Sequence, residues 1–206
     1  MDPAHRLFLE CTWEAMEHGG VVVGDNQQKI GVFAGVEGNY LHQNLVSPPN
    51  GNTTPKYIDP AVRVSRRLGN SIDYFTMRVS HQLNLIGPSF TPMATCSTSL
   101  LAVHLAVQNL RLGECTAAVV GGAKIELPKT PVYRAGMEGM LSTSGRVRPF
   151  DADADGTIFG NGVAVVVLKL LEDAVKDGNP VYGVIRGTGF CNDGNPADKK
   201  SFIAPT

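Results

Sequence analysis

The sequence predicts an α/β layered fold built around a buried sheet. Short, nearly continuous apolar runs that end in glycine recur along the chain, and such runs are typical of strands buried on both faces. Segments of helix length, apolar on one side and polar on the other, alternate with these runs. We find no tandem repeat, so we expect one ordinary globular domain or a part of a larger one.

The first elements of this pattern are a helix and a buried strand. The helix is expected over residues 2–18, with Asp2 as N-cap, Pro3 at the first helical position and a double glycine as the stop. The strand is expected over residues 29–36. Residues 37–60 contain many prolines, glycines and asparagines, so we predict a long excursion without a packed element.

The same alternation continues to the end of the chain. We predict helices over residues 73–85, from just after Cys96 to about residue 112, and over residues 171–176. The predicted strands span residues 89–94, 116–122, 163–168 and 181–189.

Composition excludes several classes of protein. The chain is 43% hydrophobic and 18% charged, with a formal net charge of −1, so it lacks the basic surface that nucleic acid or an anionic membrane would need. Apolar stretches fall short of the roughly 18 residues that span a bilayer, and the N-terminus does not resemble a secretory signal. The four cysteines are widely spaced, which argues against a metal site and a disulfide framework. We therefore expect a cytoplasmic protein without a nucleic-acid, membrane or metal partner.

Cys96 is the most informative candidate for a catalytic residue. It lies between an expected strand and the apolar run of residues 101–110, and three hydroxyl residues follow it directly. The free N–H groups and the positive dipole end of a helix N-terminus favour a thiolate, which is a competent nucleophile. Cysteine is also among the most buried residue types, so a small core residue is the alternative interpretation.

Three alternating aspartates, Asp151, Asp153 and Asp155, superficially suggest a calcium-binding loop. The EF-hand pattern requires a glutamate six residues after its glycine, and that position is Gly162 in this chain. We interpret the aspartates as a solvated turn.

Five motifs extend over nearly the whole chain in a fixed order. They are the early helix of residues 1–17, the segment Thr95-Cys-Ser-Thr-Ser-Leu100 with its helix to Gly113, the strand end Gly121-Gly122, the loop of residues 139–156 with its Arg-Pro-Phe-Asp, and the segment from Asn192 to Thr206. Together they resemble the β-ketoacyl synthase (ketosynthase) domain of modular polyketide synthases, a branch of the thiolase-like superfamily.

The resemblance implies a thiolase-like α-β-α-β-α fold and a condensing acyltransferase. Cys96 would attack an acyl thioester on the phosphopantetheine arm of an acyl carrier protein, and its backbone N–H would donate to the developing oxyanion. A malonyl-type extender would then lose carbon dioxide, and its carbanion would attack the acyl-cysteine. No directly bound cofactor is implied, since the carrier protein delivers the arm.

The resemblance also implies which part of the domain this chain represents. The family uses two histidine motifs downstream of the nucleophile, and none of the five histidines here lies in either context. The strand expected before the first helix is absent too. We therefore expect residues 1–206 to be mainly the N-terminal half of the domain, inactive alone, with the intact domain forming a homodimer through residues 89–94.

Candidate substrate-binding residues are Thr95, Met137 and Met140. Thr95 ends a Met-Ala-Thr segment where the family commonly has Asp-Thr-Ala. We expect these three residues to shape the pocket floor or the dimer contact, so this departure would affect the selectivity for the acyl group. The two methionines are expected to line an acyl channel or to serve ordinary packing. Two other functions stay open: a non-elongating ketosynthase that only transfers or docks acyl chains, and a thiolase-like enzyme acting on coenzyme A thioesters.

Overall fold

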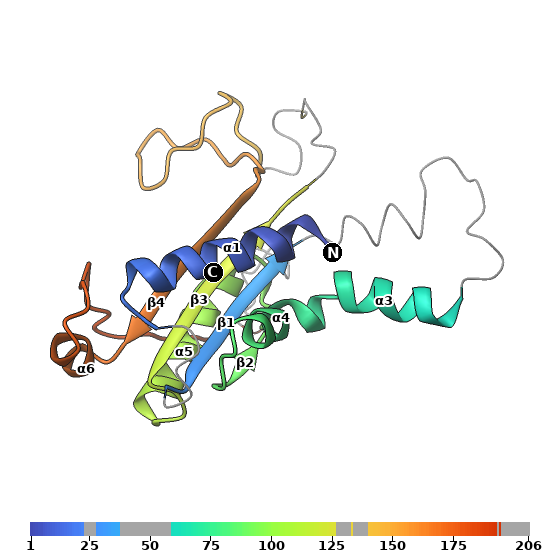
Figure 1. Ribbon diagram of the computed structural model, residues 1–206. Helices are drawn as coiled ribbons and strands as arrows, with labels where there is room; N and C mark the ends of the chain where they lie inside the picture. Colours follow the sequence, from blue (N-terminus) through green and yellow to red (C-terminus); the bar gives the residue numbers. More distant parts are fainter. Residues whose placement is uncertain (23–27, 38–58, 127–132, 134–139, 193, 195–206) are drawn as a thin grey trace.

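The computed structural model contains one sheet of four strands and describes residues 1–22, 28–37, 59–126, 133, 140–192 and 194 (Figure 1). The strand order is β2-β1-β3-β4. Strand β1 pairs in parallel with β2 and β3, whereas β4 is antiparallel to β3. The strands are β1 (Ile30–Glu37), β2 (Ser89–Phe90), β3 (Ala117–Lys124) and β4 (Gly162–Lys169).

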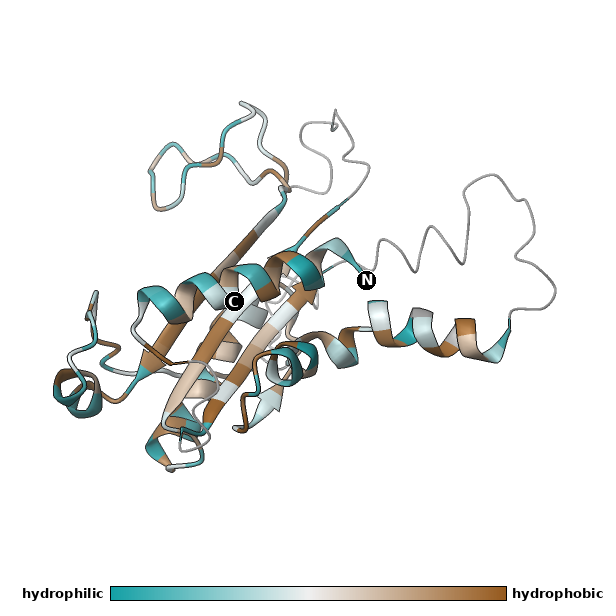
Figure 2. Cartoon of the chain, viewed as in Figure 1, coloured by the Kyte–Doolittle hydropathy of each residue, from teal (hydrophilic) through white to brown (hydrophobic). Residues whose placement is uncertain are grey.

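Helices cover both faces of this sheet. On one face, α1 (Pro3–His18) and α4 (Phe75–Gln82) pack with the sheet into one core cluster, in which the rings of Phe8 and Phe75 lie 4.6 Å apart. On the other face, α5 (Thr98–Arg111) packs against Phe33 and neighbouring alanine and valine side chains. Figure 2 shows the apolar strands between these helices. The α/β layered prediction is confirmed.

Strands β1 and β3 are the buried centre of the sheet. They pair residue for residue over their whole length, so that Gly35 lies opposite Gly122. Both strands are buried over most of their residues, which explains their nearly continuous apolar sequence. An ion pair between Glu37 and Lys124, 2.8 Å long, joins their last residues.

Helix α1 forms where its capping residues predict it. The Asp2 carboxylate accepts a hydrogen bond of 2.9 Å from the Ala4 N–H, and Pro3 occupies the first helical position. Helix α6 (Leu171–Lys176) also has the predicted bounds. Across the residues that the structure describes, no helix is long and apolar enough to cross a membrane.

Three predicted elements differ from the structure. Strand β2 ends at Phe90 rather than at residue 94, because Pro92 has no N–H with which to continue a ladder. The helix predicted over residues 73–85 divides into a 3₁₀ turn, Ile72–Tyr74, and the shorter α4. Residues 181–189 are not a strand, and three glycines within them weaken extended pairing.

Another helix, α3 (Pro60–Asn70), is an element that we did not predict. The Asp59 carboxylate caps it by accepting a hydrogen bond of 2.7 Å from the Ala61 N–H. Most of the region predicted as an excursion, residues 38–58, lies outside the described residues.

Candidate active site

Cys96 lies at the junction between the sheet and α5. It is the middle residue of a 3₁₀ turn, Thr95–Ser97, that leads directly into the helix. This turn lies near the ends of β1 and β3, because α5 begins against Gly35 and Gly122. The Cys96 side chain is exposed, so a reagent can reach it from outside. The predicted strand-to-helix position of Cys96 is thus observed, although its catalytic role stays a prediction.

Two glycines allow the start of α5 to approach the sheet. A Cβ atom at Gly35 would overlap the Cγ2 methyl group of Thr98. A Cβ atom at Gly122 would lie 3.7 Å from the Cβ of Ser99, at ordinary van der Waals distance. The sequence predicts these glycines only as the ends of strands. The pairing of β1 with β3 places them side by side, directly against the start of α5.

Hydroxyl side chains hold the turn around Cys96. The Thr98 Oγ1 accepts a hydrogen bond from the Ala94 N–H at 2.9 Å and donates one to the Thr95 carbonyl at 2.8 Å. The Ser97 Oγ donates to the Ala94 carbonyl at 2.8 Å. Two of the three hydroxyl residues after Cys96 therefore stabilise the backbone. The sequence predicts that these hydroxyl residues lie at the start of the helix, but it does not predict their hydrogen bonds to the backbone.

Thr95 has a backbone conformation that is rare for its type. Its φ angle is +48°, in the left-handed region that β-branched residues avoid. Such a conformation costs on the order of 1–3 kcal/mol and is found mainly at functional sites. The strain thus lies next to the candidate nucleophile.

The other candidate residues are not brought to Cys96 by any described contact. Met140 is 44% exposed, and its carbonyl accepts a hydrogen bond of 2.8 Å from the Thr157 N–H. Met137 lies outside the described residues. The role of both methionines in acyl binding stays a prediction.

Cys115 illustrates a thiol unsuited to catalysis. It is buried beneath α5, and this burial raises its pKa to about 11. A thiol with so high a pKa is almost entirely protonated near neutral pH and is a poor nucleophile.

Two of the described histidines, His104 and His5, take part in contacts or packing within the fold. The Nδ1 atom of His104, which follows Cys96 along α5, lies 2.9 Å from the Thr188 Oγ1. His5 is a buried residue of α1, and desolvation lowers its pKa to about 4. These environments match packing roles better than proton transfer.

Asp155 organises the loop that contains the Arg-Pro-Phe-Asp segment. Its carboxylate accepts hydrogen bonds from the hydroxyl groups of Thr143, Ser142 and Ser144 and from the Ser144 N–H, at 2.7–3.0 Å. These hydrogen bonds hold the pKa of Asp155 well below its usual range. Asp155 therefore acts as a clamp that joins residues 142–144 to the later part of the loop.

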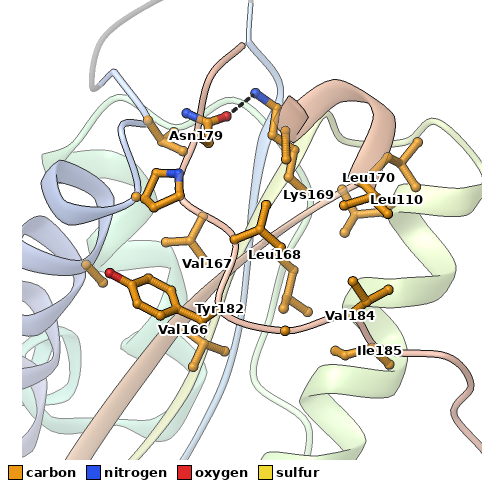
Figure 3. A pocket seen from close by; sticks show the side chains of 18 of the residues that line it. Leu110, Val166, Val167, Leu168, Lys169, Leu170, Asn179, Tyr182, Val184 and Ile185 are labelled. Carbon is orange, nitrogen blue, oxygen red and sulfur yellow. Dashed lines mark hydrogen bonds between the residues drawn. The ribbon is translucent and has the colours of Figure 1, made fainter. Parts of the chain in front are cut away.

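A cavity of about 820 Å³ lies at the other end of α5 (Figure 3). Its wall includes Leu110, Val167 and Ile185, and the Lys169 Nζ donates a hydrogen bond of 3.0 Å to Asn179 at its rim. Helix α5 has 14 residues, so the cavity and Cys96 lie about 20 Å apart. The cavity is separate from the candidate nucleophile.

An exposed cysteine on the turn before a helix has the position of an activated thiol nucleophile, which can form a covalent intermediate. Residues 1–174 match the family described as "Beta-ketoacyl synthase, N-terminal domain". The chain belongs to this β-ketoacyl synthase family.

Curated relatives are polyketide synthases. The chain is 40% identical over 206 residues to a phenolphthiocerol/phthiocerol polyketide synthase of Mycobacterium tuberculosis, covering 100% of this chain and 14% of the relative. It is 40% identical over 201 residues to phthioceranic/hydroxyphthioceranic acid synthase of Mycobacterium bovis, covering 95% of this chain and 9% of the relative.

Solved structures give the same result. The ketosynthase from module 1 of the bacillaene synthase of Bacillus amyloliquefaciens has a TM-score of 0.78 and 36% identity, covering 100% of this chain and 36% of that one. Ketosynthase twelve of the bacillaene polyketide synthase has a TM-score of 0.80 and 35% identity, covering 100% and 34%. The chain thus spans about a third of these ketosynthases, and the resemblance to a thiolase-like ketosynthase is confirmed.

Proposed function

We propose that this chain is a partial ketosynthase domain of a modular polyketide synthase, mainly its N-terminal half, and that Cys96 is its acyl-accepting nucleophile. The observation that carries the proposal is the exposed Cys96 on the turn that opens α5, in a chain that matches the family over residues 1–174. Its substrates are acyl groups on the phosphopantetheine arm of an acyl carrier protein, and this chain itself binds no cofactor.

The first step is transfer of the acyl group to Cys96. The thiolate sulfur attacks the thioester carbonyl, and the bond between that carbonyl carbon and the pantetheine sulfur then breaks. The arm leaves as a thiolate, which takes up a proton. Because one thioester replaces another, little energy is released, and the protein contributes mainly by positioning and by stabilising the oxyanion. The Cys96 N–H, at the start of a helix, is suited to the second task.

The second step is condensation. The extender loses carbon dioxide, its carbanion attacks the acyl carbonyl, and Cys96 leaves as a thiolate when the new carbon–carbon bond has formed. His5 is buried and His104 contacts Thr188, so neither is suited to support the decarboxylation. We assign that support to the two histidine motifs that the family resemblance implies.

The intact domain is proposed to pair with a second copy through the segment that begins with β2. Strand β2 lies at an edge of the four-stranded sheet, where it can accept a further strand. Apolar side chains near this edge are exposed: Phe90 by 51% and Met93 by 75%. Thr95, Met137 and Met140 remain the proposed contacts of the acyl chain.

The experiment that tests this proposal is acylation of the complete synthase by an acyl N-acetylcysteamine thioester, with the modified residue located by peptide mass spectrometry. We expect the acyl group on Cys96 and no acylation at that peptide in Cys96→Ala. Cys191→Ala is the matched control, because Cys191 is also exposed and should be dispensable. Acylation that persists in Cys96→Ala at the same rate would contradict the assignment. Product analysis with the complete synthase and a malonyl carrier protein then separates condensation from simple acyl transfer.

A further inference from the structure

We propose that Thr98 is a positioning residue for acyl transfer to Cys96, an inference that rests on the proposed function. Its hydroxyl group bonds two residues that precede Cys96. The Thr98 Oγ1 accepts from the Ala94 N–H and donates to the Thr95 carbonyl. One side chain thus bridges the entry to the turn and the residue directly before the nucleophile.

The Thr95 carbonyl accepts hydrogen bonds from both the Thr98 Oγ1 and the Thr98 backbone N–H, and the side-chain bond adds a second restraint on the direction of the Cys96 N–H. The Thr95 carbonyl and the Cys96 N–H belong to the same planar, trans peptide unit, so the two groups point in opposite directions. A hydrogen bond that holds the carbonyl therefore also holds the N–H. In the proposed reaction this N–H donates to the oxyanion, and such a donor is effective only when it is aimed in advance.

The Thr98 side chain is itself held on its other side. Its Cγ2 methyl group lies so close to Gly35 of β1 that a Cβ there would overlap it. The hydroxyl group thus binds the turn while the methyl group contacts the sheet. This arrangement relates the Thr95–Cys96 peptide to a rigid element of the fold.

The left-handed φ of +48° at Thr95 explains why such a restraint is needed. A threonine released from this conformation favours negative φ, and the change would rotate the peptide that carries the Cys96 N–H. Glycine adopts positive φ readily and would need no such restraint. Thr98 therefore stabilises a conformation that Thr95 alone would leave.

The test compares two reactions of Cys96 in the purified complete synthase. Acylation by a thioester develops an oxyanion, whereas alkylation by iodoacetamide does not. Thr98→Val keeps the shape and loses the hydroxyl group, and we expect Cys96 acylation to fall about 10- to 100-fold. Cys96 alkylation should change by less than about threefold, because the thiol remains accessible. Thr98→Ser, which keeps the hydroxyl group, should acylate within about threefold of the wild type.

Three results would overturn the proposal. Thr98→Val could acylate as fast as the wild type, acylation and alkylation could fall together, or Thr98→Ser could be as slow as Thr98→Val. Alkylation of the buried Cys115 reports unfolding of any variant. If Thr98→Val unfolds, Thr95→Gly/Thr98→Val decides: recovery of folding and acylation supports the proposal, and failure to recover overturns it.

A separate measurement distinguishes this inference from the proposed function. The Ala94 amide hydrogen should exchange faster in Thr98→Val than in the wild type, since it loses its acceptor. If the wild-type Cys96 is not acylated at all, the proposed function fails. The Ala94 exchange rate then still decides whether Thr98 holds the turn, and an unchanged rate overturns that role.

Discussion

Substitution of Gly35 by alanine tests the close contact between β1 and α5. The new methyl group would overlap the Thr98 Cγ2, and the neighbouring sheet leaves little room for a shift. Overpacking of this kind costs about 1–3 kcal/mol. Alanine also avoids the conformational entropy that glycine loses in a strand, a gain of about 0.5–1 kcal/mol. We therefore expect Gly35→Ala to lower the free energy of unfolding by about 1–2 kcal/mol.

Urea unfolding of four variants measures this effect. Gly122→Ala is the matched control, because Gly122 pairs with Gly35 and its new Cβ would lie 3.7 Å from Ser99. We expect Gly122→Ala to change the free energy of unfolding by less than about 0.5 kcal/mol. In Gly35→Ala/Thr98→Ser the overlapping methyl group is gone, so the double variant should recover about 1 kcal/mol relative to the sum of the single variants. Equal stability of Gly35→Ala and Gly122→Ala, or strictly additive effects of the Gly35 and Thr98 changes, would show that the Thr98 methyl group does not limit the space at Gly35.

Two further predictions concern pH. The lowered pKa of Asp155 means that its stabilising hydrogen bonds are fully present above the unfolded pKa of about 4 and are lost as the pH falls below it. Asp155→Asn should therefore make cleavage of residues 140–157 by a protease faster at pH 7, and an unchanged rate would contradict the role of the clamp. The pKa of His5 is lowered to about 4, so the unfolded chain binds a proton first, near pH 6.5, and stability should fall between pH 7 and pH 5 by on the order of 1–2 kcal/mol. His5→Gln should flatten this part of the pH dependence in thermal unfolding, and an equal slope in both proteins would exclude His5 as its source.

Local signals in the sequence were sufficient for α1, α5 and α6 and for the position of the candidate nucleophile, but not for α3 or for the exact bounds of α4. Asp2 and Pro3 fix the start of α1 through short-range capping, and the apolar run after Cys96 fixes α5. Family membership followed because several motifs kept their order along the chain.

Features that depend on contacts between residues far apart in the sequence could not be predicted from local sequence patterns. Residues 181–189 have a strand-like composition, but strand formation requires a paired neighbour, and the structure shows none of this pairing. The contact between Gly35 and Thr98 depends on how β1 and α5 pack, which no local pattern encodes. The left-handed Thr95 is likewise a product of the surrounding turn, since its residue type disfavours that conformation.

The parallel pairing of β1 with β3 has a consequence for the synthesis of this protein. Each residue of β1 leaves the ribosome 87 residues before its partner in β3, for example Ile30 before Ala117, which is about 4–17 seconds at about 5–20 residues per second. During this interval the apolar strand β1 lacks β3, the partner with which it pairs over its whole length. Unpaired apolar strands promote aggregation of nascent chains. Slowing translation within residues 38–116 should therefore lower the yield of soluble protein, and a chaperone that binds extended apolar segments should restore it.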